Sequence, residues 1–96
     1  MAARAQRALT FAVRGPISAA DLPGLCERVC ALMTEAQATH AVCDVHGVEP
    51  TAATVDALAR LQLAAGRLGC RVRLRGASDD LRELVAFMGL EDVLPE

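Results

Sequence analysis

Aromatic residues are almost missing from this chain of 96 residues, which contains two Phe and neither Trp nor Tyr. Proteins that hold single-stranded nucleic acid usually stack its bases on aromatic side chains, and those platforms are lacking here. Lysine is absent as well, and the ten Arg are outnumbered by twelve Asp and Glu, which leaves a net charge of −2. Because nucleic-acid-binding domains normally carry a basic excess, we expect no nucleic-acid partner.

Long hydrophobic runs are missing too. No stretch approaches the roughly 18 consecutive apolar residues of a membrane-spanning helix. The segment between Arg4 and Arg14 has no uninterrupted apolar core, so it does not have the pattern of a signal peptide. We therefore expect a cytoplasmic protein without direct membrane insertion, in which cysteine thiols stay reduced.

Residue sets that carry catalysis or bind metals are also absent. The two histidines, His40 and His46, have no nucleophile placed beside them, and the seven glycines form no phosphate-binding loop. Cys26 and Cys30 are four residues apart, but no second pair follows to complete a zinc site. We therefore interpret the four cysteines as buried thiols and predict a binding protein, not an enzyme, with no metal and no cofactor.

The chain is rich in small and aliphatic apolar residues, mainly Ala, Leu and Val, within a hydrophobic share of 53%. A chain of this length can form one hydrophobic core but not two domains. We therefore predict a single α/β domain over residues 1–96, with its core in about residues 8–94.

Three short segments alternate apolar and polar residues with the period of a strand that has one buried face. They cover residues 8–13, 40–45 and 70–75. In the third segment, Arg71, Arg73 and Arg75 share the face opposite the apolar residues. These arginines either keep a sheet surface solvated or form a docking stripe for an acidic partner.

Apolar residues at helical spacing predict three helices. The first spans about residues 21–36, with Ser18 as an alternative start. The second covers residues 49–68, and the third is capped by Ser78 and ended by Gly89. The predicted inner faces consist of Leu22, Leu25, Cys26, Val29, Leu32 and Met33, then Val55, Leu58, Leu61, Gln62, Ala65 and Leu68, then Leu81, Leu84, Val85 and Met88.

The alternating order of strands and helices predicts right-handed crossovers and a largely parallel sheet. A turn at residues 15–16 makes the first connection. Strands buried on both faces would read as continuous apolar runs, whereas these three alternate. We therefore expect the helices to cover mainly one face of the sheet and to leave the other face open.

The whole arrangement resembles a known family. An apolar strand closes on Asp44 and Val45, a helix begins near residues 51–54, and the last helix ends in Phe-Met-Gly-Leu at residues 87–90. Over about residues 9–94, this order is similar to that of a STAS domain, the fold of bacterial anti-sigma factor antagonists. The resemblance implies a mostly parallel or mixed β-sheet with helices mainly on one face.

The resemblance also implies a function. In such antagonists, a Ser or Thr at the start of the second helix is phosphorylated by the partner, an anti-sigma factor that is also a serine kinase. The unphosphorylated antagonist binds this partner and frees the sigma factor, and the phosphate breaks the complex. The family's Asp-Ser-Ser/Ala-Gly-Leu/Ile segment aligns with residues 52–56, where Thr54 takes the acceptor position without the flanking Asp and Gly. Thr51 is the alternative acceptor and the better helix cap.

The contact surface is expected on the loop after the second strand and on the first turn of the second helix. The predicted partner-binding residues are Asp44, His46, Gly47, Val48, Glu49, Pro50, Thr51, Thr54 and Val55. Two alternatives stay open at this point. The chain could be a cytosolic STAS subunit or regulator of a membrane lipid transporter, or a degenerate STAS domain that works without phosphorylation.

Overall fold

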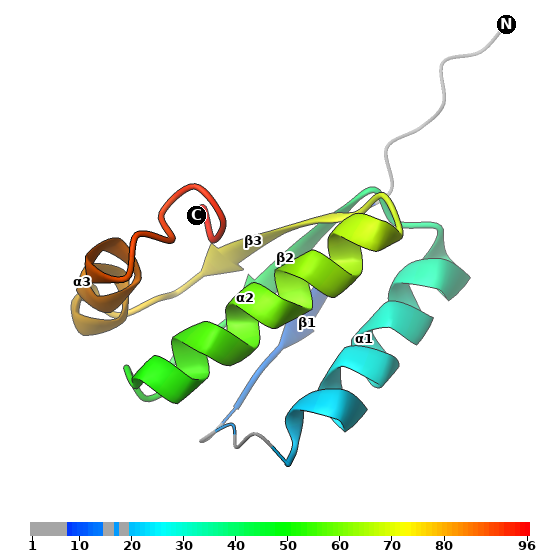
Figure 1. Ribbon diagram of the computed structural model, residues 1–96. Coiled ribbons are helices and arrows are strands. Elements are labelled where there is room, and N and C mark those ends of the chain that lie inside the picture. The colour runs from blue at the N-terminus through cyan, green and yellow to red at the C-terminus, as the bar shows by residue number, and fades with distance from the viewer. Residues whose placement is uncertain (1–7, 15–16, 18–19) are drawn as a thin grey trace, which may run out of the picture.

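Three strands alternate with three helices in the computed structural model, which describes residues 8–14, 17 and 20–96 (Figure 1). The elements are β1 (Ala8–Ala12), α1 (Leu22–Ala36), β2 (His40–Asp44), α2 (Ala52–Arg67), β3 (Arg71–Arg75) and α3 (Asp79–Phe87). The predicted α/β class and element order are confirmed, although each strand is shorter than predicted, at 5 residues. The predicted turn at residues 15–16 and the alternative helix start at Ser18 lie outside the described residues.

The three strands form one parallel sheet in the order β1-β2-β3, as the alternation of strands and helices predicts. β2 lies in the centre, where Cys43 is level with Phe11 of β1 and Leu74 of β3. Parallel strands all end at the same edge of a sheet. The segments that follow the three strands therefore meet at this carboxyl edge, although they are far apart in the chain.

One face of the sheet is covered by helices. Figure 1 shows α1 and α2 side by side on the same side of the strands, and α3 at one end of the sheet beyond β3. On the covered face Ala41, Cys43 and Leu74 are buried, and the core continues into α2 through Leu58 and Leu61. The core is thus a single layer between the sheet and its helices.

None of the described helices covers the opposite face of the sheet, as the alternating strands predict. Arg71, Arg73 and Arg75 of β3 are all exposed on it. Across the sheet they are level with His40, Val42 and Asp44 of β2. These three β2 residues are half-buried, so the strand centre is partly shielded by its neighbours.

Three residues predicted on inner helix faces are instead exposed. Leu32 is 45% exposed because it lies about 100° around the helix from the buried Met33. Leu68 and Met88, exposed at 46% and 36%, are the C-cap residues of α2 and α3. There the chain leaves the helix and no longer follows its periodicity.

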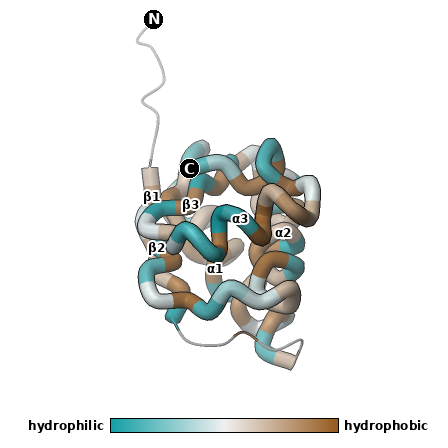
Figure 2. Tube along the Cα trace, turned by 90° about the vertical axis from the view of Figure 1, so that its left-hand side faces the viewer, coloured by the Kyte–Doolittle hydropathy of each residue, from teal (hydrophilic) through white to brown (hydrophobic). Residues whose placement is uncertain are grey.

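The helix caps follow the predicted pattern, although α2 begins at Ala52 and not at residue 49, because Thr51 caps the helix. Thr51 accepts a hydrogen bond from the Thr54 N–H at the start of α2, and Ser78 accepts one from Leu81 at the start of α3. Pro23 lies in the first turn of α1, where no intrahelical donor is needed. Hydrophobic and hydrophilic residues alternate along the helices in Figure 2, as one-sided burial requires. Among the described residues, no helix combines the length and apolar character needed to cross a bilayer.

The outer edge of β3 is covered by a side chain of α2 and by the segment after α3. Gln62 donates to the carbonyl oxygens of Val72 and Val93, at 2.7 and 2.8 Å, and accepts from the Val72 N–H at 2.9 Å. The Leu74 N–H donates to the Pro95 carbonyl oxygen at 2.8 Å. These bonds satisfy a strand edge that would otherwise be open to pairing with another chain.

Candidate functional site

Asp44, the last residue of β2, organises the carboxyl edge of the sheet. Its Oδ1 accepts a hydrogen bond from the backbone N–H of His46 at 3.0 Å. The buried Val45 lies between these two residues, and its N–H donates to the Arg75 carbonyl oxygen at 2.9 Å. These two hydrogen bonds fix the direction in which the chain leaves the sheet, because they connect the end of β2 to the loop and to β3.

Residues 45–48 form a tight turn at this edge, in which the Val48 N–H donates to the Val45 carbonyl oxygen at 3.0 Å. Gly47, the third residue of the turn, has a φ of 80°, and a type II turn needs a positive φ at this position. Val45 and Val48 are buried, whereas His46 and Gly47 are exposed. The turn is thus anchored at both ends by core residues and presents its tip to solvent.

Two arginines from the neighbouring strand ends converge on Asp44. Arg14 Nη1 lies 3.8 Å from Asp44 Oδ1, and Arg75 Nη2 lies 3.6 Å from Asp44 Oδ2. Arg14 also donates to the His46 carbonyl oxygen at 3.3 Å. The His46 N–H, and then the two guanidinium groups, hold the pKa of Asp44 below its usual range, although partial desolvation opposes them. Asp44 is therefore an anion that braces the loop, and not a general acid near neutral pH.

Gly76 lies directly after β3 and is in close contact with this cluster. Its φ is 76°, and an added Cβ would lie 3.2 Å from the His46 Cβ and 3.3 Å from the Asp44 Oδ1. Both the backbone conformation and the available space therefore favour glycine here. Nothing in the local sequence predicts this role, because Arg14, Asp44 and Gly76 meet only through the pairing of three strands.

The start of α2 lies next to the turn and contains the two predicted phospho-acceptors. Thr51 is exposed, and its hydroxyl accepts from the Thr54 N–H at 3.1 Å and donates to the Thr54 Oγ1 at 2.9 Å. Thr54 is 1% exposed and is the one buried polar residue in the described part of the chain. The Thr54 hydroxyl is thus enclosed in the first turn of α2, whereas Thr51 lies at the surface.

The exposed part of the predicted contact surface is narrower than the sequence suggests. Val48, Thr54 and Val55 are not on the surface, at 4%, 1% and 0% exposed, because their side chains pack inward. Asp44 is half-buried beneath the turn. The exposed members of the predicted set are His46, Gly47, Glu49, Pro50 and Thr51.

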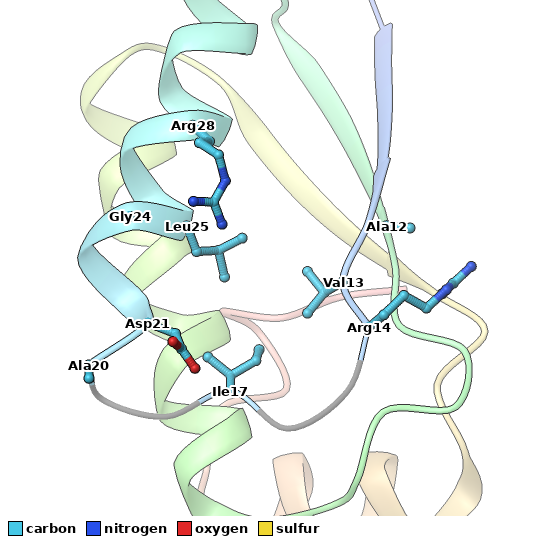
Figure 3. Close-up of a pocket in the computed structure, with 9 residues that line it drawn as sticks. All are labelled: Ala12, Val13, Arg14, Ile17, Ala20, Asp21, Gly24, Leu25 and Arg28. Atoms are coloured by element: carbon cyan, nitrogen blue, oxygen red, sulfur yellow. The ribbon is translucent and has the colours of Figure 1, made fainter.

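A hollow of about 460 Å³ lies between the end of β1 and the start of α1 (Figure 3). Figure 3 shows Asp21, Leu25 and Arg28 reaching into it from the side of α1, opposite Val13. Arg14 belongs to the rim, but its guanidinium points away from α1. The hollow combines an acid and a base with apolar side chains, so it has no single charge preference. No motif in the sequence predicts it.

Cys43 and Cys70 are buried as predicted. Cys26 and Cys30, in contrast, are only half-buried, because they lie toward the edge of the helix stripe that faces the core. Burial raises the pKa of Cys43 to about 12, with Asp44 as the second cause. Burial also raises the pKa of Cys26 and that of Cys70, in each case with Cys30 as the second cause. Thiols with raised pKa values stay protonated near neutral pH and react slowly. Among the described residues, no group of three or more His, Cys, Asp or Glu side chains is placed to hold a metal ion.

Comparison with known proteins does not assign the chain to a family. No protein-family model matches it, and no curated protein is significantly similar to it. The site is therefore defined by its geometry. At the carboxyl edge it combines the turn 45–48, the exposed cap of α2 and a carboxylate held by two arginines. Loops held on a rigid scaffold in this way are common binding surfaces.

Proposed function

We propose that this chain is a STAS-like regulatory domain that binds a kinase-type anti-sigma factor through the carboxyl edge of its sheet, without enzymatic activity of its own. The observation that supports this most is the position of the exposed turn 45–48 beside the exposed cap of α2. These are the two segments that the resemblance to anti-sigma factor antagonists assigns to partner binding. The single covered face of the parallel sheet is also compatible with the proposal.

The turn supplies a preorganised contact surface. Val45 and Val48 hold its ends in the core, while Asp44 and Arg14 bind the backbone of His46. A segment that is already ordered in its binding conformation loses little entropy on association, which favours affinity. The partner therefore meets a fixed shape at this edge.

Phosphorylation at the start of α2 would change this surface strongly. A phosphate adds about −1.5 to −2 charges at neutral pH, and a helix N-terminus accommodates it without unfolding the domain. Thr51 is the acceptor that a kinase can reach in the described conformation. Modification of Thr54 would require the first turn of α2 to open, because its hydroxyl is enclosed.

Binding to purified kinase-type anti-sigma factors of the source cell, measured singly by calorimetry, tests the proposal. We expect one of them to bind, and Thr51→Glu to weaken that binding at least about tenfold, as loss of a central contact does. Thr10→Glu is the matched control, since it adds the same charge to an exposed residue on the open face of β1. The proposal is wrong if no anti-sigma factor binds, or if both variants bind as the wild type does.

Incubation of the bound pair with ATP, followed by mass spectrometry, identifies the switch residue. Phosphate on Thr51 supports the accessible acceptor, and phosphate on Thr54 shows that the start of α2 opens during the reaction. Intact binding with no phosphate on either residue would identify a phosphorylation-independent antagonist.

A further inference from the structure

A second concave surface adjoins the proposed contact edge. It is a hollow of about 480 Å³ between the residue preceding the cap of α2 and the outer side of α3. Its described lining consists of Pro50, Asp80, Glu83, Leu84 and Phe87. We call these five residues the α3 groove. Pro50 belongs both to this groove and to the exposed part of the predicted contact surface, so the two surfaces are continuous.

Phe87 dominates the apolar part of the α3 groove. Its side chain is 88% exposed, more than any other large hydrophobic residue in the described chain, and it is one of only two aromatic residues in the protein. Leu84 lies one turn earlier on α3 and is half-buried, so the two form a short apolar strip. Exposed aromatic residues next to a hollow are frequent anchors of protein interfaces.

The polar part of the α3 groove is acidic. Asp80 and Glu83 are both exposed, and neither forms an ion pair within the described part of the chain. The nearby Arg82 does not neutralise them, because its guanidinium binds Asp79 and Glu96 instead. The groove therefore presents two unpaired carboxylates beside an apolar strip.

We propose that the α3 groove binds a basic, apolar segment of the partner, which places an apolar side chain against Phe87 and Arg or Lys opposite Asp80 and Glu83. Charge complementarity selects this occupant, since an acidic or neutral segment would leave both carboxylates without a counter-charge. This proposal rests on the proposed function, because it extends the same contact edge along α3. It adds the chemistry of the partner segment, which the turn and the cap of α2 do not specify.

Selection from short random peptides displayed on phage tests the α3 groove directly. The full chain is the target, and the Phe87→Ala variant is used for counter-selection. We expect the selected peptides to combine Arg or Lys with apolar residues. Affinities are then measured by fluorescence polarisation on synthetic copies of these peptides, and amide NMR spectra check that each variant is folded.

The variants separate the contribution of the Phe87 side chain from that of the two carboxylates. Phe87→Ala should weaken the peptides at least about tenfold. Asp80→Asn with Glu83→Gln should weaken them about fivefold at low salt and less at high salt. The matched controls are Leu63→Ala, at a residue 63% exposed on α2, and Glu27→Gln with Glu35→Gln on α1. These controls should bind as the wild type does.

Several outcomes would overturn the groove proposal. The proposal is wrong if the selected peptides lack basic residues, or if they bind the Phe87→Ala variant as well as the wild type. It is also wrong if the wild type self-associates and Phe87→Ala abolishes this, because a second copy of the chain would then occupy the groove. The two proposals fail separately. If an anti-sigma factor binds in a way that depends on Thr51, but no selected peptide depends on Phe87, only the groove proposal is wrong. If peptides depend on Phe87 but no anti-sigma factor binds, the proposed partner is wrong and the groove proposal stands.

Discussion

Helices α2 and α3 begin alike but are held in the molecule by different means. Each starts with a hydroxyl cap, Thr51 or Ser78. α2 then buries six residues over its length, whereas α3 buries two and leaves Phe87 exposed in its last turn. The same capped amphipathic pattern thus produces one helix that forms the core and another that presents a surface.

The difference extends to what surrounds each helix. α2 lies over the sheet, where apolar contacts hold it and Gln62 adds hydrogen bonds to β3 and Val93. The segment that leads into α3 depends on Gly76, which has a positive φ. The turn 45–48 at the same edge depends on the carboxylate of Asp44 and its polar partners. Loss of a contact should therefore lower stability most at α2 and less at the edge.

The largest expected effect on stability is at α2. Leu61→Ala removes a side chain that is 1% exposed and leaves a cavity, which should lower the free energy of unfolding by about 2–5 kcal/mol. Phe87→Ala on α3 should change it by no more than about 0.5 kcal/mol. Chemical denaturation of the two variants measures both values. Similar losses in both would show that α3 is as much a part of the core as α2.

An intermediate effect is expected where β3 leads into α3. Gly76→Ala forces a left-handed conformation on an L-residue, which costs about 1–2 kcal/mol. The added Cβ also presses on His46 and Asp44, so NMR signals of the turn 45–48 should shift. Gly66→Ala in α2 is the control, because it has open space around it and should stabilise the helix by up to about 1 kcal/mol. Equal effects of the two substitutions would contradict the tight packing at the edge.

The smallest expected effect is on the pH dependence of stability. In the folded chain, the pKa of Asp44 lies below its ordinary value of 3.8. The ionised carboxylate therefore stabilises the fold fully above pH 3.8, and this stabilisation is lost as the pH falls through the lowered pKa of the folded chain. Asp44→Asn keeps an acceptor for the His46 N–H but removes the charge. The wild type should therefore be more stable than this variant at pH 7 and equal to it at strongly acidic pH, as thermal unfolding at several pH values can measure. A difference that is constant with pH would show that the charge of Asp44 is not stabilising.

Local sequence patterns predicted most of the secondary structure. Alternation in the three strands and the caps Thr51 and Ser78 depend on neighbouring residues alone, so they could be identified before any tertiary contact was known. Periodicity failed at Leu32, Leu68 and Met88. The first lies at the margin of its helical stripe, and the other two lie where the helix ends.

The candidate site was only partly predictable. Of the nine residues predicted on the loop after β2 and the start of α2, five are exposed and four are buried or half-buried. The burial of Thr54 was not predicted, because a Thr in the first turn can point outward or inward depending on the packing of the helix. The roles of Arg14 and Gly76 were also missed, since neither is part of a local motif.

What the sequence by itself determined is therefore the set of elements, their order and the one-sided burial of the sheet, because these follow from short-range periodicity and capping. Only the tertiary structure decided which side chains share the carboxyl edge. Parallel pairing of three strands brings Arg14, Asp44 and Arg75 together from positions separated by a helix each. It also decided that Phe87 stays exposed, because α3 packs at the end of the sheet and buries only Leu81 and Val85.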